Sequence, residues 1–83
     1  MNTSFLLLAE FETTLIPLSG IAEKYLGMKP STAENKARTG ELPFPTLRVG
    51  ESQKSPRMVH VEDLAAFIDL RRKEAREEYS RMQ

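Results

Sequence analysis

The chain has 83 residues, no cysteine and a formal net charge of zero. This length allows one domain with a modest core, and small domains of this kind often gain stability by self-association. The lack of cysteine excludes disulfides and thiolate metal sites, which agrees with a reducing compartment. The apolar segment 5–9 is too short to span a membrane and lacks the flanks of a signal peptide. We therefore expect a cytoplasmic protein with no membrane partner.

The charges are unevenly distributed along the chain. Residues 29–57 carry six basic and three acidic side chains, whereas the segments before and after them are weakly acidic. A DNA backbone responds to local patches of charge and not to the net value. The middle of the chain is therefore the candidate for contact with nucleic acid, and a merely solvated basic surface is the alternative.

Two short apolar segments open the chain. The run from Phe5 to Phe11 fits a buried strand or a short helix, and its periodicity does not decide between them. A second apolar segment, residues 15–18, follows three residues later, which favours a hairpin of two strands within residues 1–18. Pro17 suits the end or edge of such a strand because it has no N–H to donate.

Two helices are predicted within residues 19–40. The first begins at Ser19, a favoured N-cap residue, and ends at Gly27, a residue type that often follows the last helical turn. The second begins at Ser31, which has the capping-box spacing to Glu34, and closes at Gly40. Two short helices joined by a few residues form a helix-turn-helix pattern.

The second helix has a polar stripe at i, i+3, i+4 and i+7. Side chains at this spacing share one helix face, and their donors and acceptors are of the kind that read base edges in the major groove. The alternative is a solvated helix face with no partner. The candidate base-reading residues are Thr32, Asn35, Lys36 and Thr39.

Residues 44–61 are predicted to form a two-stranded wing. Segments 46–49 and 57–61 read as strands, and the polar segment between them contains turn residues. A basic hairpin after two helices is the order of a winged helix, in which the wing contacts the DNA backbone or minor groove. The candidate phosphate-binding residues, in the wing and near the second helix, are Lys29, Ser31, Arg38, Arg48, Lys54 and Arg57.

A long helix is predicted over residues 62–83. At about 30 Å it would project beyond a domain of this size. The projecting half keeps a narrow apolar seam of Ala75, Tyr79 and Met82, which favours contact with a second copy of the chain. A frayed, solvated tail is the alternative.

The residues offer no catalytic constellation. His60 is the single histidine, and we expect it to pack or to cap the following helix. General base catalysis would also need an orienting partner and a nucleophile. Metal binding would need clustered ligands, so we expect no cofactor, no metal and no enzyme activity.

The order of these motifs resembles the pyocin activator protein (PrtN) family. The most specific pieces are "IPL" at 16–18, "GELPFP" at 40–45, "SQKS" at 52–55 and "VHVEDLA" at 59–65. More distantly, the sequence is similar to winged helices of the MerR and excisionase type. The resemblance implies an activator of bacteriocin or prophage genes that binds promoter DNA.

We therefore predict an α+β fold over residues 1–83: a small winged helix-turn-helix with N-terminal strands, a two-stranded wing and a long C-terminal helix. The expected partners are double-stranded promoter DNA and a second copy of the chain, with RNA polymerase as a further candidate. Two other functions stay open. One is an excisionase-like factor that bends DNA. The other is a protein-interaction module, such as an antirepressor, that acts through the C-terminal helix.

Overall fold

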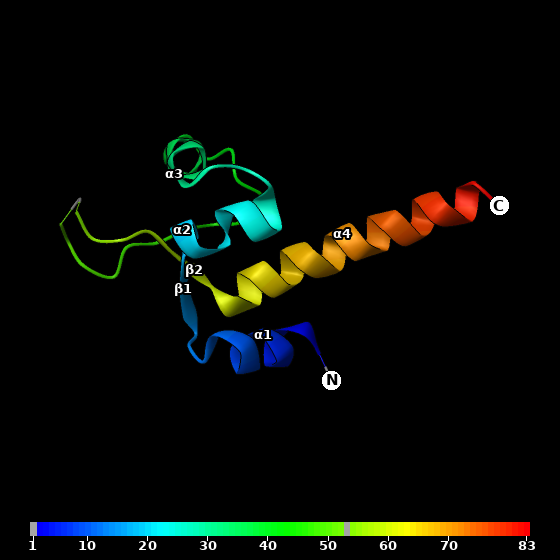
Figure 1. Ribbon diagram of the computed structural model, residues 1–83, viewed down its shortest axis with the longest axis horizontal. Helices are drawn as coiled ribbons and strands as arrows, with labels where there is room; N and C mark the ends of the chain where they lie inside the picture. The colour runs from blue at the N-terminus through cyan, green and yellow to red at the C-terminus, as the bar shows by residue number, and fades with distance from the viewer. Residues whose placement is uncertain (1, 53) are drawn as a thin grey trace.

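A computed structural model describes residues 2–52 and 54–83 of the chain. The fold is α+β and winged-helix-like, with a two-stranded antiparallel sheet and a long C-terminal helix, as the sequence predicted (Figure 1). The elements in chain order are α1 (Thr3–Phe11), β1 (Leu15–Pro17), α2 (Leu18–Ile21), η1 (Ala22–Leu26), α3 (Pro30–Arg38), β2 (Met58–His60) and α4 (Val61–Arg81).

Strands β1 and β2 form the sheet at the centre of the molecule. Ile16 and Val59 face each other in the register, and both are fully buried. β1 leads directly into α2, and β2 leads directly into α4. The backbone N–H of Leu18, at the start of α2, donates to the carbonyl of Arg57 just before β2. The sheet therefore fixes where both helices begin.

The expected strand over residues 5–11 is wrong, because this segment is helix α1. The run contains no β-branched residue and is rich in strong helix formers such as Leu7, Leu8 and Ala9. The Asn2 side chain caps the helix by accepting from the N–H of Phe5. Glu12 then ends the helix in the left-handed region, with φ of 57°. The predicted N-terminal hairpin therefore does not exist, and β1 pairs with β2 instead.

Helix α1 lies along the first half of α4 (Figure 1). Leu7 is buried in the contact, and Thr3 donates a hydrogen bond to Asp69. On the other side, Glu10 accepts hydrogen bonds from Lys24 and Tyr25 of η1. The bonds from Lys24 and Tyr25 lower the pKa of the Glu10 carboxyl, and the bond to Glu10 raises the pKa of the Lys24 ammonium. The helix is thus tied to two different parts of the fold.

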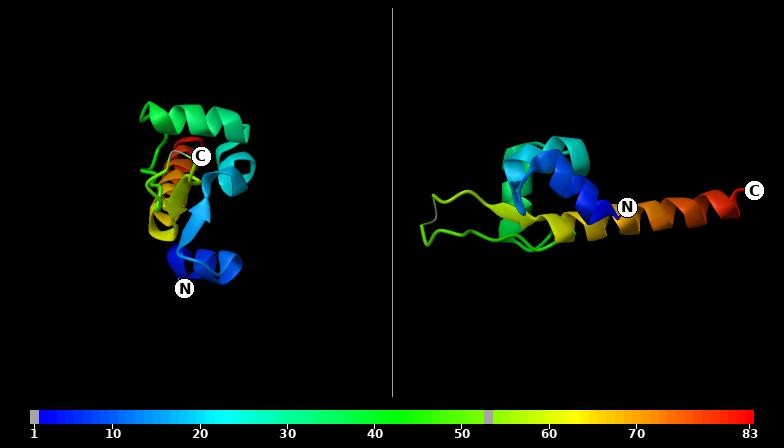
Figure 2. Two further views of the ribbon diagram at one scale, coloured as in Figure 1. Left: turned by 90° about the vertical axis from the view of Figure 1, so that its left-hand side faces the viewer. Right: turned by 90° about the horizontal axis from the view of Figure 1, so that it is seen from below.

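The two arms of the wing form fewer backbone hydrogen bonds with each other than the predicted pairing of strands 46–49 and 57–61 would require. Leu47 and Met58 form an isolated antiparallel bridge, with two backbone hydrogen bonds of 2.9 and 2.7 Å. On the opposite edge of β2, Met58, Val59 and His60 pair with Pro17, Ile16 and Leu15 of β1. Beyond the bridge, residues 48–52 and 54–57 extend away from the body, opposite the end of α4 (Figures 1 and 2).

Helix α4 begins in the core and ends far from it. Leu64 and Ala65 are buried, whereas every residue from Asp69 onward is exposed. The molecule measures 51 × 28 × 17 Å, and its long axis follows this helix (Figure 2). Its accessible surface of 6099 Å² exceeds the roughly 5,000 Å² expected for a compact monomer of this mass. Among the described residues, none of the helices has both the length and the apolar character needed to cross a membrane.

The packing of α1 predicts a contrast between two neighbouring leucines. Leu7→Ala should lower the free energy of unfolding by about 2–5 kcal/mol, because it opens a cavity in the core. Leu6→Ala is the matched control, since Leu6 is 53% exposed, and it should cost less than about 0.5 kcal/mol. Urea titration followed by circular dichroism measures both. Equal losses would show that α1 does not present Leu7 to the core.

Candidate nucleic-acid interface

Helix α3 lies within the basic segment 29–57 and is exposed on its outer face. It begins at Pro30, after Lys29 in an extended conformation, and proline at the first helical position loses no hydrogen bond. It ends in a Schellman motif, because Gly40 has a φ of 73° and its N–H bonds the carbonyl of Ala37, while Glu41 bonds Lys36. Ala33 is buried against the preceding helices. Ala37 also packs against the core, whereas Ser31, Thr32, Asn35 and Arg38 are exposed.

Two of the predicted helix caps are wrong. α2 starts at Leu18 instead of Ser19, because the sheet hydrogen bond to Arg57 already satisfies the N–H of Leu18. Ser31 lies within the first turn of α3, and no side chain caps that helix. The Glu34 carboxylate, which the capping box would have used, binds two arginines of the wing instead.

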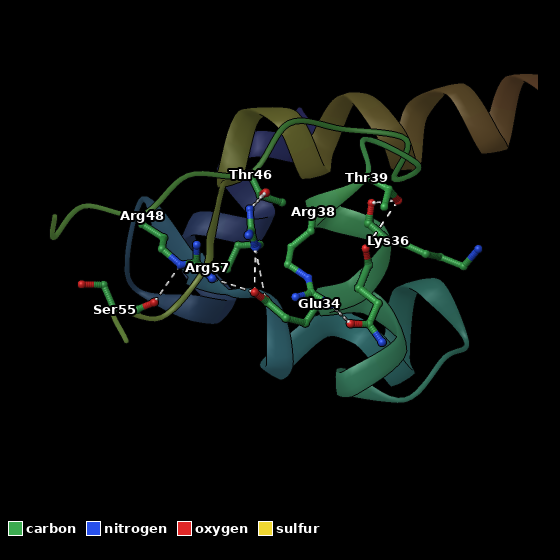
Figure 3. Close-up of polar contacts among 9 residues, drawn as sticks. Glu34, Lys36, Arg38, Thr39, Thr46, Arg48, Ser55 and Arg57 are labelled. Carbon is green, nitrogen blue, oxygen red and sulfur yellow. Dashed lines mark hydrogen bonds and ion pairs between the residues drawn. The ribbon is translucent and has the colours of Figure 1, made fainter. Parts of the chain in front are cut away.

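Glu34 connects α3 to both sides of the wing base (Figure 3). Its Oε1 accepts from Arg48 Nη2 at 2.8 Å, and both of its oxygens accept from Arg57 Nε at 3.1 Å. Arg57 Nη1 also donates to Thr46 Oγ1 at 3.0 Å. The Arg57 side chain is only 12% exposed, so its charge lies inside this contact and not at the surface.

Arg48 spans the wing. Its Nε donates to the carbonyl of Ser55 at 3.1 Å, on the opposite arm, while its Nη2 binds Glu34. One guanidinium therefore holds the two arms of the wing together and attaches them to α3. The Arg48 side chain is 28% exposed, more than that of Arg57.

A shallow hollow of about 540 Å³ lies where α3 meets the wing. Ser31, Glu34, Asn35 and Arg38 line it from α3, and Arg48 lines it from the wing. Arg38 Nη2 donates to Asn35 Oδ1 across the outer face of the helix (Figure 3). The hollow therefore combines two guanidinium groups with amide, hydroxyl and carboxylate groups, and its guanidinium, amide and hydroxyl donors suit a ligand rich in acceptors.

The structure divides the four candidate base-reading residues. Asn35 and Thr32 are exposed, and Asn35 borders the hollow. Lys36 is partly buried and extends away from Glu34, on the other flank of α3 (Figure 3). The Thr39 hydroxyl lies within 3.4 Å of the carbonyls of Asn35 and Lys36 and within 3.0 Å of Glu41, so it serves the end of its own helix.

The candidate phosphate-binding residues also fall into groups. Lys29 and Lys54 are exposed at the start of α3 and on the wing, respectively. Ser31, Arg38 and Arg48 meet at the hollow. Arg57 is the member whose geometry differs most from the expectation, because its nitrogens bind Glu34 and Thr46. Sequence reasoning missed Glu34 as a member of this site.

The candidate dimerisation residues lie on the projecting half of α4. Ala75 is exposed, as are Tyr79 at 59% and Met82 at 73%. They continue the helix face that carries Leu64 and Ile68 in the core, because residues seven or eleven apart return to nearly the same side. The seam is thus the solvent-exposed extension of the core-facing stripe.

His60 has the capping role expected from the sequence. Its Nδ1 accepts from the N–H of Glu62 at 3.0 Å and so caps the start of α4. In the part of the chain that the structure describes, no three His, Cys, Asp or Glu side chains gather as a metal site would require. Among the described residues, Glu34 is the carboxylate that pairs with two arginines.

The comparison with known families identifies the chain. No curated protein and no solved structure matches it significantly. The sequence profile of the family described as pyocin activator protein PrtN matches residues 3–75, which covers α1 through the first two thirds of α4. The chain therefore belongs to the pyocin activator protein PrtN family, which groups regulators of pyocin genes and is not an enzyme class.

Proposed function

We propose that the protein binds promoter DNA in a sequence-specific manner, as a homodimer, and thereby activates pyocin-type genes. The observation that carries the proposal is the hollow where Ser31, Asn35 and Arg38 of α3 meet Arg48 of the wing. In this account α3 enters the major groove, where Asn and Arg side chains form bidentate pairs with adenine and guanine. The wing lies along the adjacent backbone.

The exposure of each side chain indicates whether it would contact bases or phosphates. Asn35, with Thr32 beside it and Arg38 bonded to it, reads base edges. Lys29, Lys54 and the Ser31 hydroxyl contact phosphates on either side, since such contacts need only charge or a donor within reach. Lys36 lies on the other flank of α3 and would face the side of the major groove. Activation also needs a contact with RNA polymerase, for which the outer faces of α1 and α4 are available.

Two substitutions separate base reading from phosphate contact. Asn35→Ala should relax the preference at one base pair, at a cost of roughly 1–3 kcal/mol for the cognate site. Lys54→Ala should weaken binding to all duplexes alike and lower the salt slope by about 0.9. Fluorescence anisotropy with a pyocin promoter duplex and a scrambled duplex, over a range of salt concentrations, measures both effects.

The same titration tests the function itself. Wild-type protein should prefer the promoter duplex over the scrambled one by a wide margin. Equal binding to both duplexes would contradict sequence-specific recognition, and no binding to either would favour the protein-interaction alternative. A bend induced in non-promoter DNA would favour the excisionase-like alternative.

Self-association is the second part of the proposal. The exposed seam of α4 and the large surface for the mass support a second copy as the partner. Tyr79→Asp should shift the dimer toward monomer in sedimentation equilibrium while leaving the thermal midpoint of the core unchanged. Leu70→Asp is a matched control, because Leu70 is also 54% exposed but lies nine residues away, on the opposite side of the helix. If Leu70→Asp dissociates the dimer and Tyr79→Asp does not, the seam is not the interface.

A further inference from the structure

An acidic side chain stands in the middle of the proposed DNA-facing surface. Glu34 lines the hollow together with Asn35 and Arg38, and its side chain is 37% exposed. A carboxylate at this position would repel the phosphate backbone. It is tolerated here because two guanidinium groups, those of Arg48 and Arg57, lie within 3.1 Å of it.

Arg57 and Arg48 differ in how far their guanidinium groups are accessible to DNA. Arg57 is bound at Nε by both Glu34 oxygens and at Nη1 by Thr46, and it is 12% exposed. Arg48 shares one Glu34 oxygen, lines the hollow and is more exposed. The charges of Glu34 and Arg57 therefore offset each other, and Arg48 remains the more exposed of the two arginines.

The same bonds fix the position of the wing relative to α3. Arg57 lies just before β2, and Arg48 follows the Leu47–Met58 bridge that closes the wing base. Among the described residues, that bridge is the one backbone pairing between the two arms, and it joins them to the sheet at Met58 alone. Arg57 Nε is shared by both Glu34 oxygens while its Nη1 binds Thr46, and these bonds together restrict the orientation of the guanidinium as well as its distance.

We propose that Glu34 is a positioning residue that locks the wing onto α3, and that Arg57 promotes DNA binding by neutralising Glu34 and not by contacting a phosphate. This inference rests on the proposed DNA-binding function. It assigns Glu34 a role in specificity, because it sets the distance between the groups that read bases and the wing that follows the backbone. It also assigns the wing's outward charge to Arg48 and Lys54.

A double-mutant cycle with promoter DNA tests the role of Arg57. Arg57→Ala should weaken binding on the order of tenfold or more, since it leaves an uncompensated carboxylate against the phosphates. Adding Glu34→Gln should restore most of that loss, because the repelling charge is then gone. Lys54→Ala is the control: Glu34→Gln should change its affinity only by as much as it changes that of the wild type, because Lys54 makes no bond to Glu34. If Arg57→Ala does not fold, Arg57→Gln replaces it in the cycle.

Glu34→Gln alone has a different expected effect. Loss of the negative charge should strengthen binding to a scrambled duplex, while the looser wing reduces the preference for the promoter duplex. The ratio of the two affinities should therefore fall, whereas Lys54→Ala leaves that ratio unchanged. An unchanged ratio for Glu34→Gln, or a double variant as weak as Arg57→Ala, would overturn the proposal.

A DNA-free measurement separates this inference from the proposed function. In the protein alone, Glu34→Gln should accelerate hydrogen exchange at the amides of Leu47 and Met58, whose bonds close the wing base. Lys54→Ala should leave that exchange unchanged. If the wild type shows no preference for promoter DNA but this acceleration occurs, the proposed function fails and the lock on the wing stands. Unchanged exchange in Glu34→Gln refutes the lock whatever the DNA results are.

Discussion

The pairing of β1 with β2 is the constraint on which the rest of the structure depends. These two short strands bring residues 15–17 against residues 58–60, and each strand continues directly into a helix. α2 therefore starts at the end of the sheet from which the wing departs, and α3 packs on α2 and η1. The position of α3 beside the wing follows from the burial of Ile16 against Val59, far below the surface where the charged side chains meet.

On that frame, a single carboxylate joins the two halves of the proposed DNA-binding surface. Most exposed ion pairs contribute little to stability. The contact of Glu34 with Arg57 differs because both carboxylate oxygens accept from Arg57 Nε and the arginine side chain is mostly buried. Its consequence is geometric, since it fixes an otherwise weakly held loop against the outward face of α3. In a regulator this small, such a bond holds the wing in place without a hydrophobic core beneath it.

Local signals in the sequence predicted those parts of the fold that local interactions determine. Gly27 and Gly40 both follow helix ends with positive φ, and His60 caps the helix that the sequence placed after it. The segment 5–11 was mispredicted because a continuous apolar run suits either a strand or a helix, and the cap at Asn2 was overlooked. Glu34 was assigned to a local capping box, although its partners lie 14 and 23 residues away in sequence. Contacts over that separation leave no periodic signal in a single sequence.

The most direct test of the account is to map the DNA-contacting surface residue by residue. Amide and side-chain NMR signals of the protein, titrated with a pyocin promoter duplex, should shift first at Ser31, Asn35, Arg38 and Arg48, which line one hollow. The projecting end of α4 should respond little. Shifts confined to α1 or α4, with α3 and the wing unperturbed, would contradict the claim that these two elements form the DNA-binding surface.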